Sequence, residues 1–178
     1  MKAAKITVGG VSYFLVLDGE GMFQIRDDFG STKLLLEAVE PDTREAFEAT
    51  CSAAALLAER GELIRRRLGY EPGKIPERDD FLLLVRPFEV VDLKNAVIKA
   101  ITLGYGREVA PEDGGEYDEG LEELNQKKNT IRRAEYYRVA ALCGLSVTEA
   151  LFMPPGEVFD LWELYLKAHG KKGNEEGE

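Results

Sequence analysis

Residue types that build most metal and catalytic sites are scarce in this sequence. Its 178 residues include one histidine, His169, and two cysteines, Cys51 and Cys143. A zinc site with several histidine or cysteine ligands therefore cannot be assembled from one chain, and a catalytic triad has a single histidine to draw on. Both cysteines lie in apolar segments with helical spacing, where a thiol usually packs as a small hydrophobe. We expect no disulfide and no cofactor.

Long apolar runs are also missing. Stretches such as residues 81–85 are far too short to cross a bilayer, and the N-terminus has no basic region followed by an apolar run and a cleavage site. We therefore expect a cytoplasmic protein with no membrane partner.

Acidic residues outnumber basic ones by 33 to 23, and the formal net charge is −10. This charge repels nucleic-acid phosphates and anionic lipid headgroups at long range, so it argues against non-specific binding to either. With 44% hydrophobic content, the chain can form one core, or a core plus a smaller helical lobe. Protein partners are the class that this composition favours.

The N-terminal segment predicts a β-hairpin. Residues 5–8 and 11–17 are mostly β-branched, aromatic or aliphatic. Between them, Gly9 and Gly10 can adopt the positive φ angles that a two-residue hairpin turn requires. Asp18 follows as an N-cap for the first helix.

The rest of the chain predicts helices that are separated by glycine and proline breaks. A long helix near the middle has an apolar stripe, and Gly61 within it is a candidate position for a kink or a break. Residues 81–85 fit a strand or a helix, and residues 70–80 predict a loop. The expected helices cover residues 19–29, 32–39, 43–68, 87–104, 121–143, 147–153 and 157–169.

Composition changes most sharply over residues 105–120, which are rich in glycine and acidic residues. This change predicts a mobile linker. The linker divides the chain into an N-terminal hairpin plus helical domain (1–104), a helical C-terminal lobe (121–170) and a disordered tail (171–178). The expected fold class is mainly α with a small N-terminal β-hairpin, an α+β protein.

The hairpin and first helix contain the pattern I-T-V-x-G-x-x-Y-x-L, followed by F-G at the helix end. The residues in this pattern are Ile6, Thr7, Val8, Gly10, Tyr13, Leu15, Phe29 and Gly30. The pattern resembles the opening of the tail assembly chaperones of long-tailed, siphovirus-like bacteriophages and prophages. Residues 135–170 are similar to the helical extension that often follows in prophage tail proteins.

The resemblance implies a chaperone that binds the tape measure protein through apolar surface, keeps it soluble and helps recruit tail tube protein. It also implies homo-oligomers in the cytosol of a bacterial host, and an unpaired strand edge in the hairpin is one route to self-association. A structural tail or head–tail component that stays in the phage particle is the main alternative.

A metal-dependent nuclease is the alternative of another class. Asp79 or Asp80 with Glu89, Asp92 and Lys94 could supply carboxylates for a divalent ion and a lysine that orients water. The helical spacing of this segment instead places Asp92 and Lys94 on a helix surface, and the acidic net charge opposes DNA binding. We expect no enzyme activity, and no catalytic, cofactor-binding or metal-binding residues.

The C-terminal lobe supplies the candidate partner-binding residues. Phe159, Trp162 and Tyr165 form an aromatic face on the last predicted helix, and aromatic anchors are common centres of protein interfaces. The same stripe also fits the core of the lobe, because amphipathic helices usually pack within their own domain. Residues 136–142 are apolar nearly all round, which predicts that this part of its helix is buried.

Overall fold

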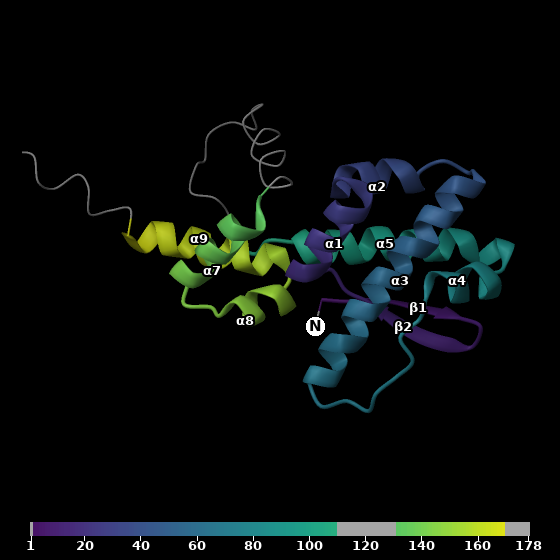
Figure 1. The fold of residues 1–178 in the computed structure, drawn as a ribbon, viewed down its shortest axis with the longest axis horizontal. Helices are drawn as coiled ribbons and strands as arrows, with labels where there is room; N and C mark the ends of the chain where they lie inside the picture. The colour runs from purple at the N-terminus through teal and green to yellow at the C-terminus, as the bar shows by residue number, and fades with distance from the viewer. Residues whose placement is uncertain (1, 110–130, 170–178) are drawn as a thin grey trace, which may run out of the picture.

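The computed structural model of the chain describes residues 2–109 and 131–169 (Figure 1). Within these ranges the fold is mainly helical with a small antiparallel hairpin at the N-terminus, which confirms the predicted fold class. The helical elements are α1 (Gly19–Phe29), α2 (Thr32–Val39), α3 (Arg44–Arg67), α4 (Arg78–Leu84), the 3-10 turn η1 (Pro87–Glu89), α5 (Val90–Tyr105), α7 (Arg133–Leu142), α8 (Val147–Phe152) and α9 (Pro155–His169).

The predicted hairpin is confirmed as β1 (Ala4–Val8) and β2 (Val11–Leu15). Gly9 and Gly10 have φ angles of 57° and 81°, which a two-residue turn requires at both positions. β2 ends two residues before its predicted end. The N–H of Val16 donates to the carbonyl of Leu57 in α3 instead of extending the ladder.

Local capping signals place the ends of the first helices as predicted. Asp18 accepts a hydrogen bond from the N–H of Gly21 at the start of α1, and Ser31 accepts one from Leu34 in α2. At the end of α1, Gly30 has a φ of 82°, the left-handed conformation that favours glycine.

Helix α3 lies at the centre of the N-terminal part, where it packs against the hairpin, α2, α4 and α5. It runs through Gly61 without a break, so the helix is not split there. Glycine is needed at this position for another reason. A Cβ at Gly61 would lie 1.7 Å from the carbonyl oxygen of Phe14, so any side chain would force β2 away from the helix.

Two element boundaries between α3 and α5 differ from the prediction. The expected loop 70–80 ends early, because the side chain of Asp80 accepts a hydrogen bond from the N–H of Glu77 at 2.9 Å and caps the first turn of α4, which starts at Arg78. Residues 81–85, which fit either a strand or a helix, belong mainly to α4. The helix expected from Pro87 begins as the short turn η1 and becomes α-helical at Val90.

Only part of the predicted helix 121–143 lies within the described residues. There the helix starts at Arg133, because the side chain of Glu135 accepts a hydrogen bond from the N–H of Arg132 and caps its first turn. The predicted burial of residues 136–142 is confirmed for only part of them. Tyr136 and Ala140 are buried, while Leu142 on another face is exposed. One helix face therefore packs inward.

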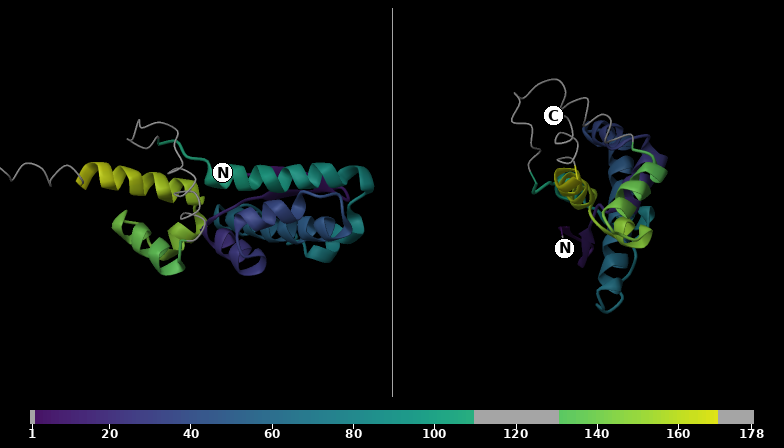
Figure 2. Two further views of the ribbon diagram at one scale, coloured as in Figure 1. Left: turned by 90° about the horizontal axis from the view of Figure 1, so that it is seen from above. Right: turned by 90° about the vertical axis from the view of Figure 1, so that its left-hand side faces the viewer.

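The C-terminal helices pack on α1 rather than standing apart. The ring of Tyr136 meets that of Phe23 edge-on at 5.4 Å, and Arg133 forms an ion pair with Glu20 at 2.8 Å. One contiguous hydrophobic core extends from the hairpin to α9. Figure 2 shows α5 and α9 arranged roughly end to end along the long axis.

Most of the predicted linker 105–120 and the tail 171–178 lie outside the described residues. At the described end of the linker, Arg107 donates to Asp160 at 2.8 Å, and the N–H of Glu108 donates to the same carboxylate at 2.7 Å. Residues 107–108 are therefore bound to α9. In the described ranges, no helix is both long enough and apolar enough to cross a membrane.

Candidate protein-binding surface

The three aromatic residues predicted to bind a partner have different environments. Phe159 is 7% exposed and packs edge-on against Tyr136 at 6.2 Å, so it belongs to the core. Trp162 and Tyr165 are half-buried and stack on each other at 5.4 Å. Tyr165 stacks in turn on His169 at 4.1 Å. The three side chains do not form one accessible face, and Phe159 is not available to a partner.

The residues considered for a nuclease have separate structural roles. Asp80 pairs with Lys74 at 2.5 Å, and this hydrogen bond lowers the pKa of the Asp80 carboxyl. Glu89 accepts from the N–H of Arg86 at 2.8 Å, Asp92 is exposed on α5, and Lys94 donates to the carbonyl of Glu40. Among the described residues, no group of three or more histidine, cysteine, aspartate or glutamate side chains is placed to hold a metal ion.

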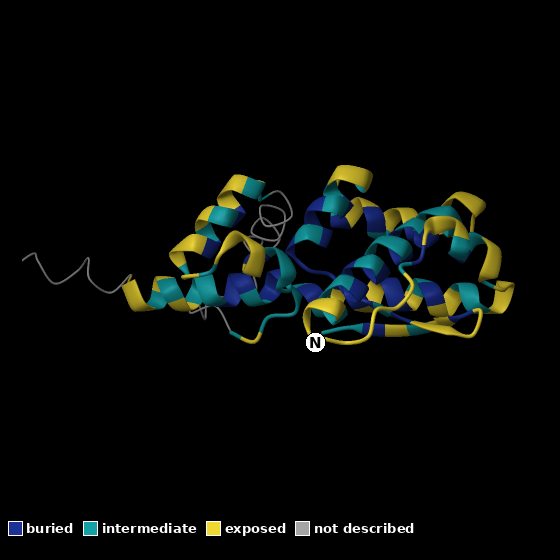
Figure 3. Cartoon of the chain, turned by 60° about the horizontal axis from the view of Figure 1, so that its bottom comes forward, coloured by how far each residue is buried: buried dark blue, intermediate teal, exposed yellow. Residues whose placement is uncertain are grey.

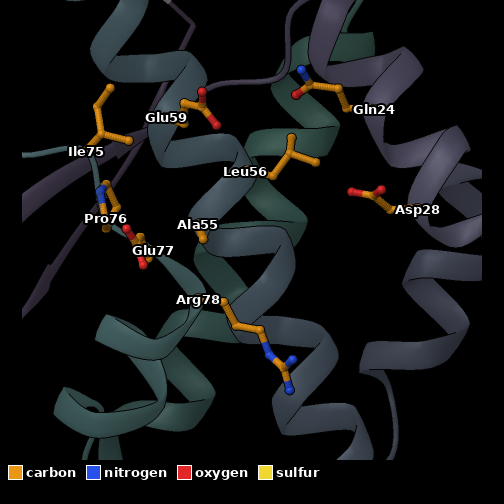
Figure 4. Close-up of a pocket in the computed structure, with 9 residues that line it drawn as sticks. All are labelled: Gln24, Asp28, Ala55, Leu56, Glu59, Ile75, Pro76, Glu77 and Arg78. Carbon is orange, nitrogen blue, oxygen red and sulfur yellow. The ribbon is translucent and has the colours of Figure 1, made fainter.

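A groove of about 460 Å³ lies between α1, α3 and the segment that precedes α4. Figure 4 shows Gln24 and Asp28 pointing from α1 toward α3, with Glu59 on α3 and Arg78 below it. Its side chains are mixed in charge and come from three different elements. This groove offers no constellation of a nucleophile with a base.

The most buried charges form an ion pair that the sequence did not reveal. Arg60 on α3 binds both carboxylate oxygens of Asp18, with nitrogen–oxygen distances of 2.8 to 3.0 Å. Burial raises the pKa of the Asp18 carboxyl, and the guanidinium opposes that shift. The other face of Arg60 covers the ring of Phe152 at 5.1 Å. This pair joins α1, α3 and α8, so it has a structural role.

The strongest functional feature is a group of exposed apolar side chains at the end of the molecule where the hairpin turn meets α4. Leu83 is 84% exposed, Phe88 is 70% exposed and Val91 is 61% exposed. Single exposed apolar residues are common on protein surfaces, but several of them at one end of a molecule favour a binding site. We call this surface the apolar corner, and its members are Val11, Leu83, Leu84, Phe88 and Val91.

The local structure explains why these side chains are exposed. Helix α4 has only 7 residues, and it buries Phe81 against Tyr13 with the rings 5.3 Å apart. Leu83 lies two residues along the same helix and so points to another side. The turn after α4 brings Phe88 to the surface, where the guanidinium of Arg86 covers its ring at 6.0 Å.

Tertiary contacts connect the corner to the hairpin. A Cβ at Gly9 would lie 3.2 Å from the Leu84 side chain, so the hairpin turn lies directly against the end of α4. The turn and α4 lie at the right-hand end in Figure 1, and Figure 3 shows many exposed residues at that end. Charged residues border the corner, including Arg86 and Asp92. An apolar centre with a polar rim is typical of protein interfaces.

The sequence carried a signal for this surface that was missed. Residues 82–84 are three consecutive leucines. Successive residues of a helix point in different directions, so a short helix that packs by one face cannot bury all three.

Comparison with known proteins gives no relative: no protein family model, no curated protein and no solved structure matches this chain.

Proposed function

We propose that this protein is a tail assembly chaperone of a phage or prophage, which binds the tape measure protein and helps recruit tail tube subunits. The observation that carries the proposal is the apolar corner. Leu83 and Phe88 are among the most exposed large apolar side chains described, and they are close in sequence on a strongly acidic protein. Such a surface supports a function in binding another protein through apolar contacts.

The choice of partner rests on the resemblance of the N-terminal pattern to tail assembly chaperones. In the fold, the residues of that pattern build the hairpin and its turn. Tyr13 and Leu15 are buried, and Gly10 has the positive φ that the turn requires. The pattern therefore encodes the scaffold against which Leu84 of the corner is placed.

The physical task of such a chaperone suits this surface. A long helical tape measure protein exposes apolar faces until the tail tube encloses it. A small partner can cover those faces with its own apolar residues, while a net charge of −10 keeps the complex soluble by repulsion. The proposal includes a homo-oligomer in the cytosol of the bacterial host, because several copies would be needed to cover a long partner.

Co-expression with the tape measure protein from the same genome tests the proposal. We expect the native chain to raise the soluble fraction of the tape measure protein and to co-purify with it. Leu83→Ser and Phe88→Ser should each reduce both effects, because they replace exposed apolar contact area with a hydroxyl group. The measurement is the amount of tape measure protein in the soluble fraction and in the affinity eluate.

Leu68→Ser is the matched control, since Leu68 is 61% exposed but lies at the other end of α3 from the corner. All three variants should keep their stability within about 0.5 kcal/mol, as exposed substitutions usually do. If the native chain neither solubilises nor retains the tape measure protein, the proposed function is wrong. Equal losses in the Leu68 and Leu83 variants would show that the corner is not the binding surface.

A further inference from the structure

The two edges of the hairpin are in different environments. The β2 edge is covered by α3, because Gly61 approaches the carbonyl of Phe14 closely and Val16 donates to Leu57 at 3.0 Å. Helix α5 packs against β1, but Lys5 and Thr7 on this strand are exposed. A groove of about 440 Å³ lies between this edge and α5.

The backbone of β1 directs hydrogen-bonding groups into that groove. In a two-residue hairpin the pair next to the turn, here Val8 and Val11, exchanges both backbone hydrogen bonds, and such pairs alternate along the strands. Lys5 and Thr7 therefore turn their N–H and C=O groups outward. These groups form no hydrogen bond with any other described residue, and an outward row of this kind can pair with a further strand.

The shape of the groove suits one extended segment. Its strand side runs from Ala4 to Thr7, a length of about 13 Å for a β-strand. Its helix side is formed by Asp92, Asn95, Ala96 and Lys99. The groove-lining residues Lys5, Thr7 and Lys99 are exposed to solvent, while Ala4 and Ala96 are buried.

The charges at the two ends of the groove are opposite. β1 and α5 run in opposite directions, since Lys2 before β1 donates to the carbonyl of Gly106 after α5 at 3.3 Å. Lys99 and Lys5 therefore lie toward one end and Asp92 toward the other. Neither Asp92 nor Lys99 has an ion-pair partner within the described parts of the chain, so both charges are available to a ligand.

We propose that this groove binds an extended peptide segment of a protein partner, which adds to β1 as an antiparallel strand. An antiparallel strand runs from the Asp92 end to the Lys99 end. The segment should therefore carry a basic residue near its N-terminal end, an acidic residue near its C-terminal end, and small apolar residues between them. Apart from Asp92, which also borders the apolar corner, this site has its own lining residues, and it does not depend on which protein binds the corner.

A second copy of the chain fits the groove less well than a peptide. Pairing two β1 strands would bring them to about 4.8 Å from each other. Two copies that pair in this way are related by a two-fold axis between their β1 strands. Because α5 forms the outer wall of the groove, this axis would bring the two α5 helices closer than the roughly 8–10 Å that packed helices need.

Fluorescence anisotropy with the full chain and a labelled hexapeptide, Lys-Val-Thr-Val-Thr-Glu, tests the proposal. Thr7→Pro removes an outward N–H without removing a hydrogen bond of the hairpin, and it should weaken binding at least about tenfold. Ser12→Pro is the matched control. Ser12 lies directly opposite Thr7, so the change disturbs the same pair but leaves the β1 edge intact.

A charge exchange provides a second test that leaves the hairpin untouched. The native chain should prefer this peptide to Glu-Val-Thr-Val-Thr-Lys by about five- to tenfold, as expected for two exposed ion pairs. The double variant Asp92→Lys with Lys99→Glu should reverse that preference. Both residues are exposed, so the variant should fold normally.

Three results would overturn the proposal. The first is the absence of binding by either peptide to the native chain. The second is a peptide preference that the charge exchange leaves unchanged. The third is a Thr7→Pro variant whose only change is a loss of dimer in sedimentation, because the β1 edge would then bind a second copy.

Discussion

The buried pair of Asp18 and Arg60 allows a quantitative prediction about stability. Arg60→Met keeps most of the side-chain volume of Arg60 but removes the guanidinium that binds both oxygens of Asp18. The carboxylate would remain fully buried, with the N–H of Gly21 as its main partner. Removing one member of a buried ion pair costs about 3–5 kcal/mol, because the remaining charge is left without compensation.

An exposed ion pair supplies the control. Arg78 binds Glu48 at 3.0 Å, and both side chains are partly or largely open to solvent. Arg78→Met makes the same chemical change, and it should lower the free energy of unfolding by at most about 1 kcal/mol. Urea unfolding followed by circular dichroism measures both values, with the denaturant slope as a check that both variants unfold in the same way.

The effect of Arg60→Met should depend on pH. Burial raises the pKa of the Asp18 carboxyl, and loss of Arg60 removes the main opposing effect, so the pKa rises further. A carboxyl whose pKa is higher in the folded than in the unfolded protein stabilises the fold below its unfolded pKa. That stability is lost as the pH rises through the folded pKa. The free energy of unfolding of Arg60→Met should therefore fall only slightly below that of the native chain near pH 3.8, the ordinary pKa of an aspartate. The difference should be larger at pH 7.

Two results would refute this reasoning. The first is a loss for Arg60→Met that is no larger than the loss for Arg78→Met, which would mean that Asp18 finds water or another partner. The second is a deficit that stays constant from acidic to neutral pH, because a buried, uncompensated carboxylate must gain stability when it is protonated.

Two further substitutions test the packing. Gly61→Ala should lower the free energy of unfolding by about 1–3 kcal/mol in a thermal melt, because the new Cβ would overlap the Phe14 carbonyl. Alanine normally stabilises a helix interior, so an unchanged or higher melting temperature would contradict the close approach. Trp162→Ala should lower the free energy of unfolding by about 1–2 kcal/mol, because the ring is half-buried and its main aromatic contact is Tyr165. Loss of a core tryptophan would cost roughly 3–5 kcal/mol. Loss of the folded C-terminal helices would show that Trp162 is a core residue.

Features with local causes could be predicted from the sequence. The hairpin turn needs two adjacent residues with positive φ, and Gly9-Gly10 supplies them. N-caps act within four residues, so Asp18 could be assigned from its neighbours alone. Helix α4 was not predicted, because residues 70–80 were expected to form a loop and residues 81–85 fitted either a strand or a helix.

Features with long-range causes could not be predicted. Arg60 lies 42 residues from Asp18, and nothing in the pattern of either segment indicates that they meet. The role of Gly61 was misjudged for the same reason, because its neighbour is the backbone of β2. The apolar corner depends on which residue of α4 packs against Tyr13, and that choice is made by the hairpin.

The division of the chain at the predicted linker affects how the binding surfaces should be studied. The C-terminal helices cover Phe23 through Tyr136, and α8 supplies the ring that covers Arg60. A chain cut short before residue 131 would therefore expose part of the core and disturb the buried ion pair. Loss of binding in such a truncated chain could come from unfolding instead of a missing contact. Because the apolar corner and the C-terminal helices lie at opposite ends of the molecule in Figure 1, point substitutions separate their roles without this ambiguity.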